Sequence, residues 1–242
     1  MRRIAIAAIL FASLTGAVHA QPLPQGAGSD AKAPANPCSD EVAASLRKLR
    51  NSSWFSMNSN MITENGPTTM VVDYILPDRM HQKITNDLTK KSSEVILIGR
   101  EAWSRQGDVS WKQLPANVAG QLQAQMDETV LQEQKDVGPY TCNGRMKLDG
   151  RDVMSYKLES TPEKGQTFKN QTYRMFYVDV MTGLPVSNAL LVPGHDNKPI
   201  FKTSYTFPLD LKIEPPKDVA PPAPAASPAP APAQGATSDT GK

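Results

Sequence analysis

Apolar and polar residues alternate along much of the middle of the chain, and this alternation predicts β-strands. Within 151–159, Tyr156 and Leu158 share one face while the residues between them belong to the other. The same period of two residues runs through 140–148 and 201–213. A strand with one face on the core and one face in water produces this pattern. The sequence therefore predicts a sheet with one apolar side.

Turn residues separate these alternating stretches at short intervals. Asn65-Gly66-Pro67 is one such signal, and Asp149-Gly150 is the strongest, because both of its positions favour positive φ. The spacing of the signals predicts about eleven strands, mostly in sequential hairpins. We therefore expect a mainly β chain of the α+β class, folded as an incomplete antiparallel β-barrel or strongly curved sheet.

Two segments show helical periodicity instead. The first begins at Ser39, whose hydroxyl we expect to cap the helix, and ends near Arg50. The second runs from Pro115 to about Lys135 and carries an apolar residue at every fourth position on an otherwise Gln-rich helix. Its apolar stripe is Val118, Leu122, Met126 and Val130. We expect this inserted helix to act as a lid over the open side of the curved sheet.

The two ends of the chain differ in composition from its middle. The first residues carry an arginine pair, then an apolar run, then small residues up to Ala20, which is the order of an export signal. Gln21 rather than cysteine follows, so we do not expect a lipid-anchored protein. The expected organisation is a signal peptide over 1–20, a disordered linker over 21–37, one folded domain over 38–214 and a disordered Pro/Ala-rich tail over 215–242.

Export determines how the two cysteines are interpreted. Cys38 and Cys142 both belong to the exported chain, and an even number of cysteines in an oxidising compartment favours one disulfide. The alternative is a pair of buried free thiols. A Cys-x-x-Cys motif is absent from the sequence, which leaves a redox enzyme without support.

Charge and hydropathy exclude further classes of protein. Removal of the signal takes away Arg2 and Arg3 and leaves equal numbers of basic and acidic residues. A neutral chain lacks the electrostatic footprint of a nucleic-acid-binding protein. The exported chain also lacks the run of about 18 apolar residues that a membrane-spanning helix requires.

The residues that usually carry catalysis are scarce. His81 and His195 lie in no metal-binding motif, and the sequence contains no Gly-x-Ser-x-Gly nucleophile motif. The acidic residues Asp149, Asp152 and Glu159 fit a hairpin tip and an exposed strand face better than a catalytic pair. We therefore expect a non-enzymatic protein that requires no cofactor and no metal.

Methionine is the unusual component of the predicted sheet. All methionines except Met1 lie within 57–181, and flexible thioethers suit an adaptable apolar surface. An ordinary core filled by methionine is the alternative, but a covering helix over a single sheet favours a cavity. The residues expected to line this cavity and its lid are Met70, Tyr74, Met80, Ile84, Leu122, Met126, Met146, Tyr156, Met175 and Phe207.

Three stretches of sequence occur in an order that is typical of one family. They are Val95–Gly99 followed by Ala102-Trp103 and Trp111–Pro115, then Tyr177–Pro185 with its Thr-Gly-Leu-Pro turn, and finally Tyr205–Phe207 running to Pro216. In this order they resemble the LolA-like superfamily of periplasmic lipoprotein carriers and lipid-binding proteins. The resemblance implies an incomplete barrel whose helices close one side over an apolar cavity. Its ligand would be a hydrophobic molecule or a lipoprotein acyl chain.

One departure from the family pattern limits this resemblance. Its lipoprotein carriers have a buried arginine in an early strand that bonds to the lid, whereas the strand 68–76 contains no arginine. Arg79 follows the turn at Pro77, so we do not transfer the role to it. We expect binding of a hydrophobic ligand in the periplasm, with an envelope or membrane protein as a further partner. The alternative is an envelope-stress sensor or protein-interaction module with a filled core.

Overall fold

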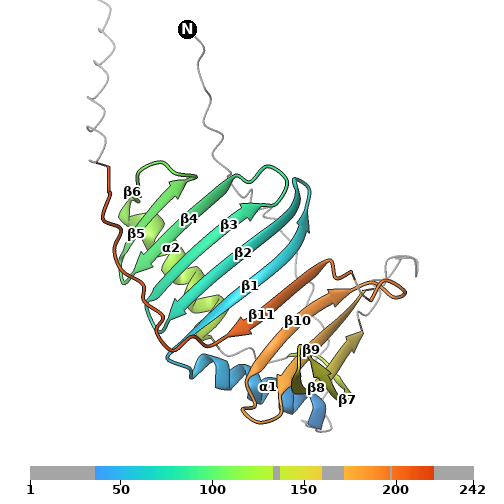
Figure 1. Ribbon diagram of the computed structural model, residues 1–242. Coiled ribbons are helices and arrows are strands. Elements are labelled where there is room, and N and C mark those ends of the chain that lie inside the picture. The colour runs from blue at the N-terminus through green and yellow to red at the C-terminus, as the bar shows by residue number, and fades with distance from the viewer. Residues whose placement is uncertain (1–35, 133–136, 160–171, 197, 221–242) are drawn as a thin grey trace, which may run out of the picture. The chain divides into compact units, whose positions relative to one another are not determined.

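The computed structural model describes residues 36–132, 137–159, 172–196 and 198–220 (Figure 1). The predicted signal peptide, most of the linker and most of the tail lie outside these residues. No helix of the described part is long and apolar enough to cross a membrane.

Eleven strands of the described residues form one antiparallel sheet, in agreement with the number that the turn signals predict. They are β1 (Trp54–Thr63), β2 (Gly66–Ile75), β3 (Arg79–Asn86), β4 (Ser92–Ile98), β5 (Glu101–Gln106), β6 (Lys112–Gln113), β7 (Thr141–Leu148), β8 (Arg151–Glu159), β9 (Tyr173–Asp179), β10 (Pro185–Leu191) and β11 (Phe201–Thr206). The predicted turn at Asp149-Gly150 joins β7 to β8, with φ of 51° and 81° at its two residues. Positive φ at both positions matches the turn that suits a two-residue hairpin.

The sheet consists of two meanders that meet in the middle. β1 to β6 form the first meander, β7 to β11 form the second, and β1 pairs with β11 to join them. At this joint Met57 lies opposite Tyr205, and Ser59 lies opposite Thr203. Within the described residues the sheet is unclosed, with β6 and β7 as its edges. The fold is therefore mainly β and an incomplete barrel, as the sequence predicts.

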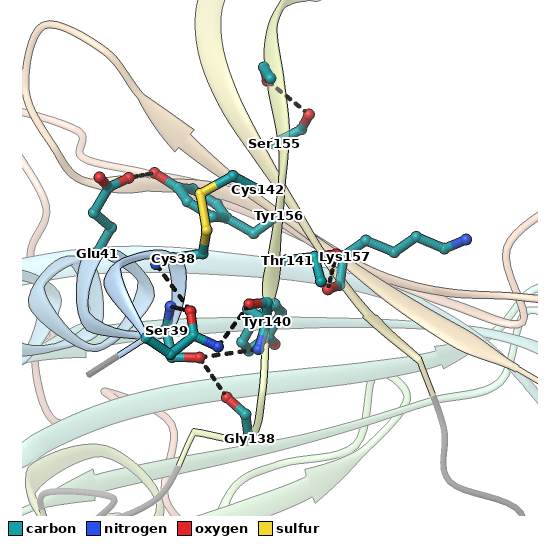
Figure 2. The surroundings of a disulfide bond; sticks show 12 residues. Cys38, Ser39, Glu41, Gly138, Tyr140, Thr141, Cys142, Ser155, Tyr156 and Lys157 are labelled. Atoms are coloured by element: carbon teal, nitrogen blue, oxygen red, sulfur yellow. Dashed lines mark hydrogen bonds between the residues drawn. A yellow bond between two sulfur atoms is a disulfide. The ribbon is translucent and has the colours of Figure 1, made fainter. Parts of the chain in front are cut away.

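Helix α1 (Pro37–Arg50) packs over the second meander and is attached at its N-terminus (Figures 1 and 2). Its N-cap is Asn36, whose Oδ1 accepts hydrogen bonds from the backbone N–H groups of Cys38 and Ser39. The prediction that Ser39 caps the helix is therefore wrong. Ser39 instead donates to the carbonyl of Gly138 and accepts from the N–H of Tyr140. The reason is local competition, because an Asx side chain before a proline at N1 already satisfies the first amides.

The predicted disulfide between Cys38 and Cys142 is confirmed, and it joins the start of α1 to β7 (Figure 2). The Tyr156 hydroxyl donates a hydrogen bond to the Glu41 carboxylate one turn further along α1. These contacts place the apolar face of α1 against β8 and β9, where Val42 is fully buried.

Helix α2 (Ala116–Met126) continues into a π-helical turn, η1 (Asp127–Leu131). This confirms the inserted helix up to residue 131, while 133–136 lie outside the described residues. The buried positions are Ala119, Met126 and Val130, with Leu122 partly buried. Ala119 is thus the buried residue in the first turns of the helix, where the four-residue spacing predicted Val118. The helix packs against β4 and β5, so the apolar stripe faces the sheet as predicted.

The inward and outward faces of the first meander carry separate apolar clusters. Phe55, Val72 and Leu97 are buried on the inward face beneath α2 and η1. On the outward face, Ile96 and Trp103 pack with Ile213 from the chain that follows β11. This C-terminal stretch runs beside the first meander (Figure 1). There the backbone N–H of Trp111 donates a hydrogen bond to the carbonyl of Asp218. Described structure thus extends beyond the boundary at 214 that composition suggests.

Candidate ligand-binding site

A cavity of about 200 Å³ lies between α2, η1 and the inward face of β1 to β3. The sheet contributes the alternate residues of each strand, because these share one face. The lining residues are Met57, Met70, Val72, Tyr74, Met80, Gln82, Leu122, Gln125, Met126 and Thr129. We call this the methionine cavity. Its walls are mainly apolar, and burial raises the pKa of Tyr74 to about 12, so this tyrosine is a neutral phenol.

A second cavity of about 220 Å³ lies between α1, η1 and strands β1, β9, β10 and β11. Leu49, Phe55 and Phe176 supply apolar walls. Arg50 and Arg174 also line it, and we therefore call it the arginine cavity.

The two cavities adjoin each other. Met57 on β1 and Thr129 on η1 line both of them. Thr129 belongs to the π-helical turn, and such turns occur frequently at functional sites. Each cavity is smaller than the roughly 300–1,000 Å³ of common small-molecule sites, whereas the two together reach the lower part of that range.

Polar groups gather around Arg174 in the arginine cavity. Arg174 is half-buried, and its Nη1 donates a hydrogen bond to Asn188 Oδ1 at 3.4 Å. The Asn188 side chain also lies beside the Tyr205 hydroxyl. Burial raises the pKa of Tyr205 to about 12, and burial also raises the pKa of Tyr140, although the Arg174 charge opposes both increases. These tyrosines are therefore neutral hydrogen-bond donors close to a guanidinium.

The structure brings together half of the residues that the sequence analysis proposed for the cavity. All of these line the methionine cavity, and they come from two strands and the lid helix. They are Met70, Tyr74, Met80, Leu122 and Met126. Phe207 packs against the same apolar cluster without lining the cavity.

Ile84 and Tyr156 lie elsewhere on the inward face. Ile84 lines a hollow of about 540 Å³ at the far end of β2 and β3, where the surroundings are mostly Thr, Ser and Asn side chains. Tyr156 is buried beneath α1 in the cluster around Val42 and Phe176. The hollow at Ile84 is wider and more open to solvent than the methionine cavity, so it would remove less of a hydrophobic ligand's surface from water.

Met146 does not face the cavity, and this corrects the expectation from alternation. The β7–β8 register shifts between Cys142 and Gly144, and Gly144 has a φ of 91°. A bulge of this kind places the following residues on the opposite face of the strand. Met146 therefore pairs with Val153 rather than sharing the face of Cys142, and 41% of its surface is exposed.

Met175 also lies on the opposite face of the sheet. It packs with Tyr173, Ala189 and Leu191 in a separate outward cluster. Strand β9 has apolar residues on both faces, so its pattern does not indicate which set points inward. The inward set contains Arg174 and Phe176, which line the arginine cavity.

The sequence analysis missed the polar part of the site. Arg174, Asn188 and Tyr205 come from three neighbouring strands of the second meander. The available signal was the position of Arg174, which is in phase with the apolar residues Phe176 and Val178. A charged residue on the apolar phase of a strand indicates either an edge position or a charge directed into a site.

The described residues also bear on metal binding. No group of three or more His, Cys, Asp or Glu side chains among them could hold a metal ion.

Solved structures with a similar fold include a lipoprotein from Mycobacterium tuberculosis, LppX. Its TM-score is 0.51 at 11% sequence identity, and the match covers 74% of this chain and 100% of LppX. LprF from Mycobacterium bovis matches with a TM-score of 0.48 at 10% identity, over 76% of this chain and 98% of LprF. A LolA superfamily protein from Nitrosomonas europaea matches with a TM-score of 0.25 at 12% identity, over 70% of this chain and 91% of that one.

No protein-family model and no curated protein sequence matches the chain. At such low identity, the likeness to LppX concerns the fold alone. Together with the likeness to LppX, the unclosed antiparallel sheet and its helices confirm the incomplete barrel that the resemblance implied.

Proposed function

We propose that this protein binds a hydrophobic ligand, such as a lipid or a lipoprotein acyl chain, without catalysing a reaction. The observation that carries the proposal is the methionine cavity beneath α2, which Met70, Met80 and Met126 line. Transfer of an apolar chain from water into this space is favourable by about 25 cal/mol per Å² of buried apolar surface. Flexible methionine side chains allow the walls to adapt to the ligand.

The proposed location is the periplasm, after removal of residues 1–20. The disulfide between Cys38 and Cys142 supports this, because such bonds persist in oxidising compartments. In this proposal the neutral exported chain carries its ligand in solution, and an envelope or membrane protein is the partner that supplies or receives it.

Uptake of N-phenyl-1-naphthylamine, a neutral apolar fluorescent probe, tests the proposal. We expect the exported protein to bind the probe and Leu122→Trp to weaken binding about tenfold or more, because the larger side chain fills the methionine cavity. Leu209→Trp is the matched control, since Leu209 is 93% exposed and should leave binding unchanged. Native mass spectrometry with organic extraction would then identify a bound lipid.

Two results would contradict the proposal. One is an unliganded mass together with no probe uptake by the wild-type protein, and that outcome would favour the protein-interaction module. The other is equal loss of binding in Leu122→Trp and Leu209→Trp, which would place the probe outside the cavity.

A further inference from the structure

The two adjoining cavities differ in charge. The residues of the methionine cavity are uncharged, whereas the arginine cavity contains Arg50 and Arg174. Among the described residues that line either cavity, none is an aspartate or a glutamate. The methionine cavity is thus uncharged, and the neighbouring cavity contains the cationic side chain of Arg174.

Arg174 lacks a charged partner within the described part of the chain, because no carboxylate there forms an ion pair with it. Its hydrogen bond to Asn188 is long, at 3.4 Å, and involves a neutral acceptor. A half-buried guanidinium among apolar walls loses part of its hydration, which costs free energy unless an anion compensates. The position of Arg174 is therefore better suited to a complex with an anion than to the empty cavity.

Further donors converge on the same place. The tyrosines Tyr140 and Tyr205 both line the arginine cavity and lie close enough to Arg174 for its charge to act on their hydroxyls. The Asn188 amide lies between Arg174 and Tyr205. An arginine fork with neighbouring hydroxyl donors is an arrangement that recognises a carboxylate or a phosphate.

We infer that the site binds an anionic amphiphile with a single alkyl chain, whose carboxylate or phosphate pairs with Arg174. The chain passes Met57 and Thr129, which line both cavities, and ends among the residues of the methionine cavity. A single chain suits two small cavities of about 220 and 200 Å³ placed side by side. This inference rests on the proposed function and defines its class of ligand.

The test compares ligands that share one chain and differ in the head group. Laurate, dodecyl phosphate and neutral monolauroyl glycerol each displace N-phenyl-1-naphthylamine from the wild-type protein. We expect at least one anion to bind about tenfold or more tightly than the neutral ester, because a charge-assisted hydrogen bond is stronger than a neutral one. The tighter anion identifies the head group as carboxylate or phosphate.

Variants locate the source of this preference. We expect Arg174→Gln to remove the preference for the anion, while a far-UV circular dichroism spectrum that matches the wild type shows that the variant folds. Arg174→Lys should keep a reduced preference, since lysine retains the charge but not the planar fork. Arg145→Gln is the matched control, because Arg145 is 60% exposed on β7 and pairs with Asp152 at 3.3 Å.

The outcomes separate this inference from the proposed function. Equal affinity of the wild-type protein for laurate, dodecyl phosphate and the neutral ester would overturn the inference and leave hydrophobic binding intact. An anion preference that survives in Arg174→Gln would overturn it as well. Failure of every probe, including the neutral dye, would refute the proposed function itself.

Discussion

Glu94 on β4 is a buried carboxylate that three basic side chains surround on the outward face of the sheet. Arg105 lies 2.9 Å from it, Lys83 3.1 Å and His81 3.3 Å. Arg174 on the inward face is held differently, since its described side-chain bond is to an amide. The buried charge on the outward face is thus satisfied within the protein, whereas the inward one is directed into a cavity.

Replacement of Glu94 should destabilise the protein in a pH-dependent way. Burial raises the pKa of Glu94, but hydrogen bonds from Lys83, Arg105 and His81 outweigh burial and hold the pKa below its usual range. Because the folded pKa is below the unfolded value of about 4.3, this carboxylate stabilises the fold above that pH and ceases to do so as the pH falls through the folded pKa. We expect Glu94→Gln to cost about 1–3 kcal/mol at pH 7.

Urea unfolding at pH 7 and at about pH 3 measures this effect. The difference between wild type and Glu94→Gln should shrink at the lower pH. Glu101→Gln is the control, because Glu101 is exposed on the neighbouring strand β5. A difference that is the same at both values would contradict the assignment of the stabilisation to the ionised carboxylate.

At the level of elements, α1 and α2 are fastened to the sheet by different means. Polar groups and a disulfide hold the start of α1, where Asn36 Nδ2 donates to the Tyr140 carbonyl at 3.0 Å and Cys38 joins Cys142 (Figure 2). Helix α2 has no side-chain N-cap and packs through the apolar residues on its inner side. Helix α2 is therefore held on the sheet by apolar contacts.

Removal of the disulfide should lower stability without undoing the docking of α1. The two cysteines are 104 residues apart, and a closed loop of about 100 residues contributes roughly 4–5 kcal/mol in the chain-entropy model. We expect Cys38→Ser/Cys142→Ser to shift the urea midpoint downward to a similar extent as a reductant does in the wild type. The far-UV circular dichroism of the folded variant should match the wild type, because the Asn36, Ser39 and Glu41 contacts remain. An unchanged midpoint after reduction would contradict this prediction.

At the scale of the whole described domain, the joint between β1 and β11 connects the two meanders. At this joint, Ser59 and Thr203 are both almost fully buried, and their hydroxyl oxygens lie 2.7 Å apart. Tyr205 on β11 belongs to the same apolar cluster as Phe55 and Leu97 from the first meander. Since the core crosses the joint, we expect the meanders to unfold together.

Two spectroscopic probes test this cooperativity. Trp54, Trp103 and Trp111 all belong to the first half of the chain, so tryptophan fluorescence reports on the first meander, while far-UV circular dichroism reports on the whole sheet. The two transitions should coincide in urea. Thr203→Val should shift both by the same amount, about 1–3 kcal/mol, because it leaves the Ser59 hydroxyl without its partner. Separate midpoints would show that the meanders unfold independently.

The sequence by itself determined the local features of this protein. Alternation and turn residues predict the strands and the hairpin at Asp149-Gly150, and apolar spacing predicts the lid helix with Leu122 and Met126 directed inward. Cysteine number and the export signal predict the Cys38–Cys142 bond. Each of these features depends on backbone preference or on the spacing of apolar residues within one element. Both can be recognised from residues that are close together in the sequence.

Only the tertiary structure decided which faces and which distant strands come together. The bulge at Gly144 turns Met146 outward, and the apolar residues on both sides of β9 conceal the inward position of Arg174. The pairing of β1 with β11 brings Tyr205 next to the first meander. These outcomes depend on register and on contacts between residues far apart in the chain, which the pattern within a single strand cannot contain. The apolar half of the site was therefore predictable from the sequence, whereas its cationic half required the fold.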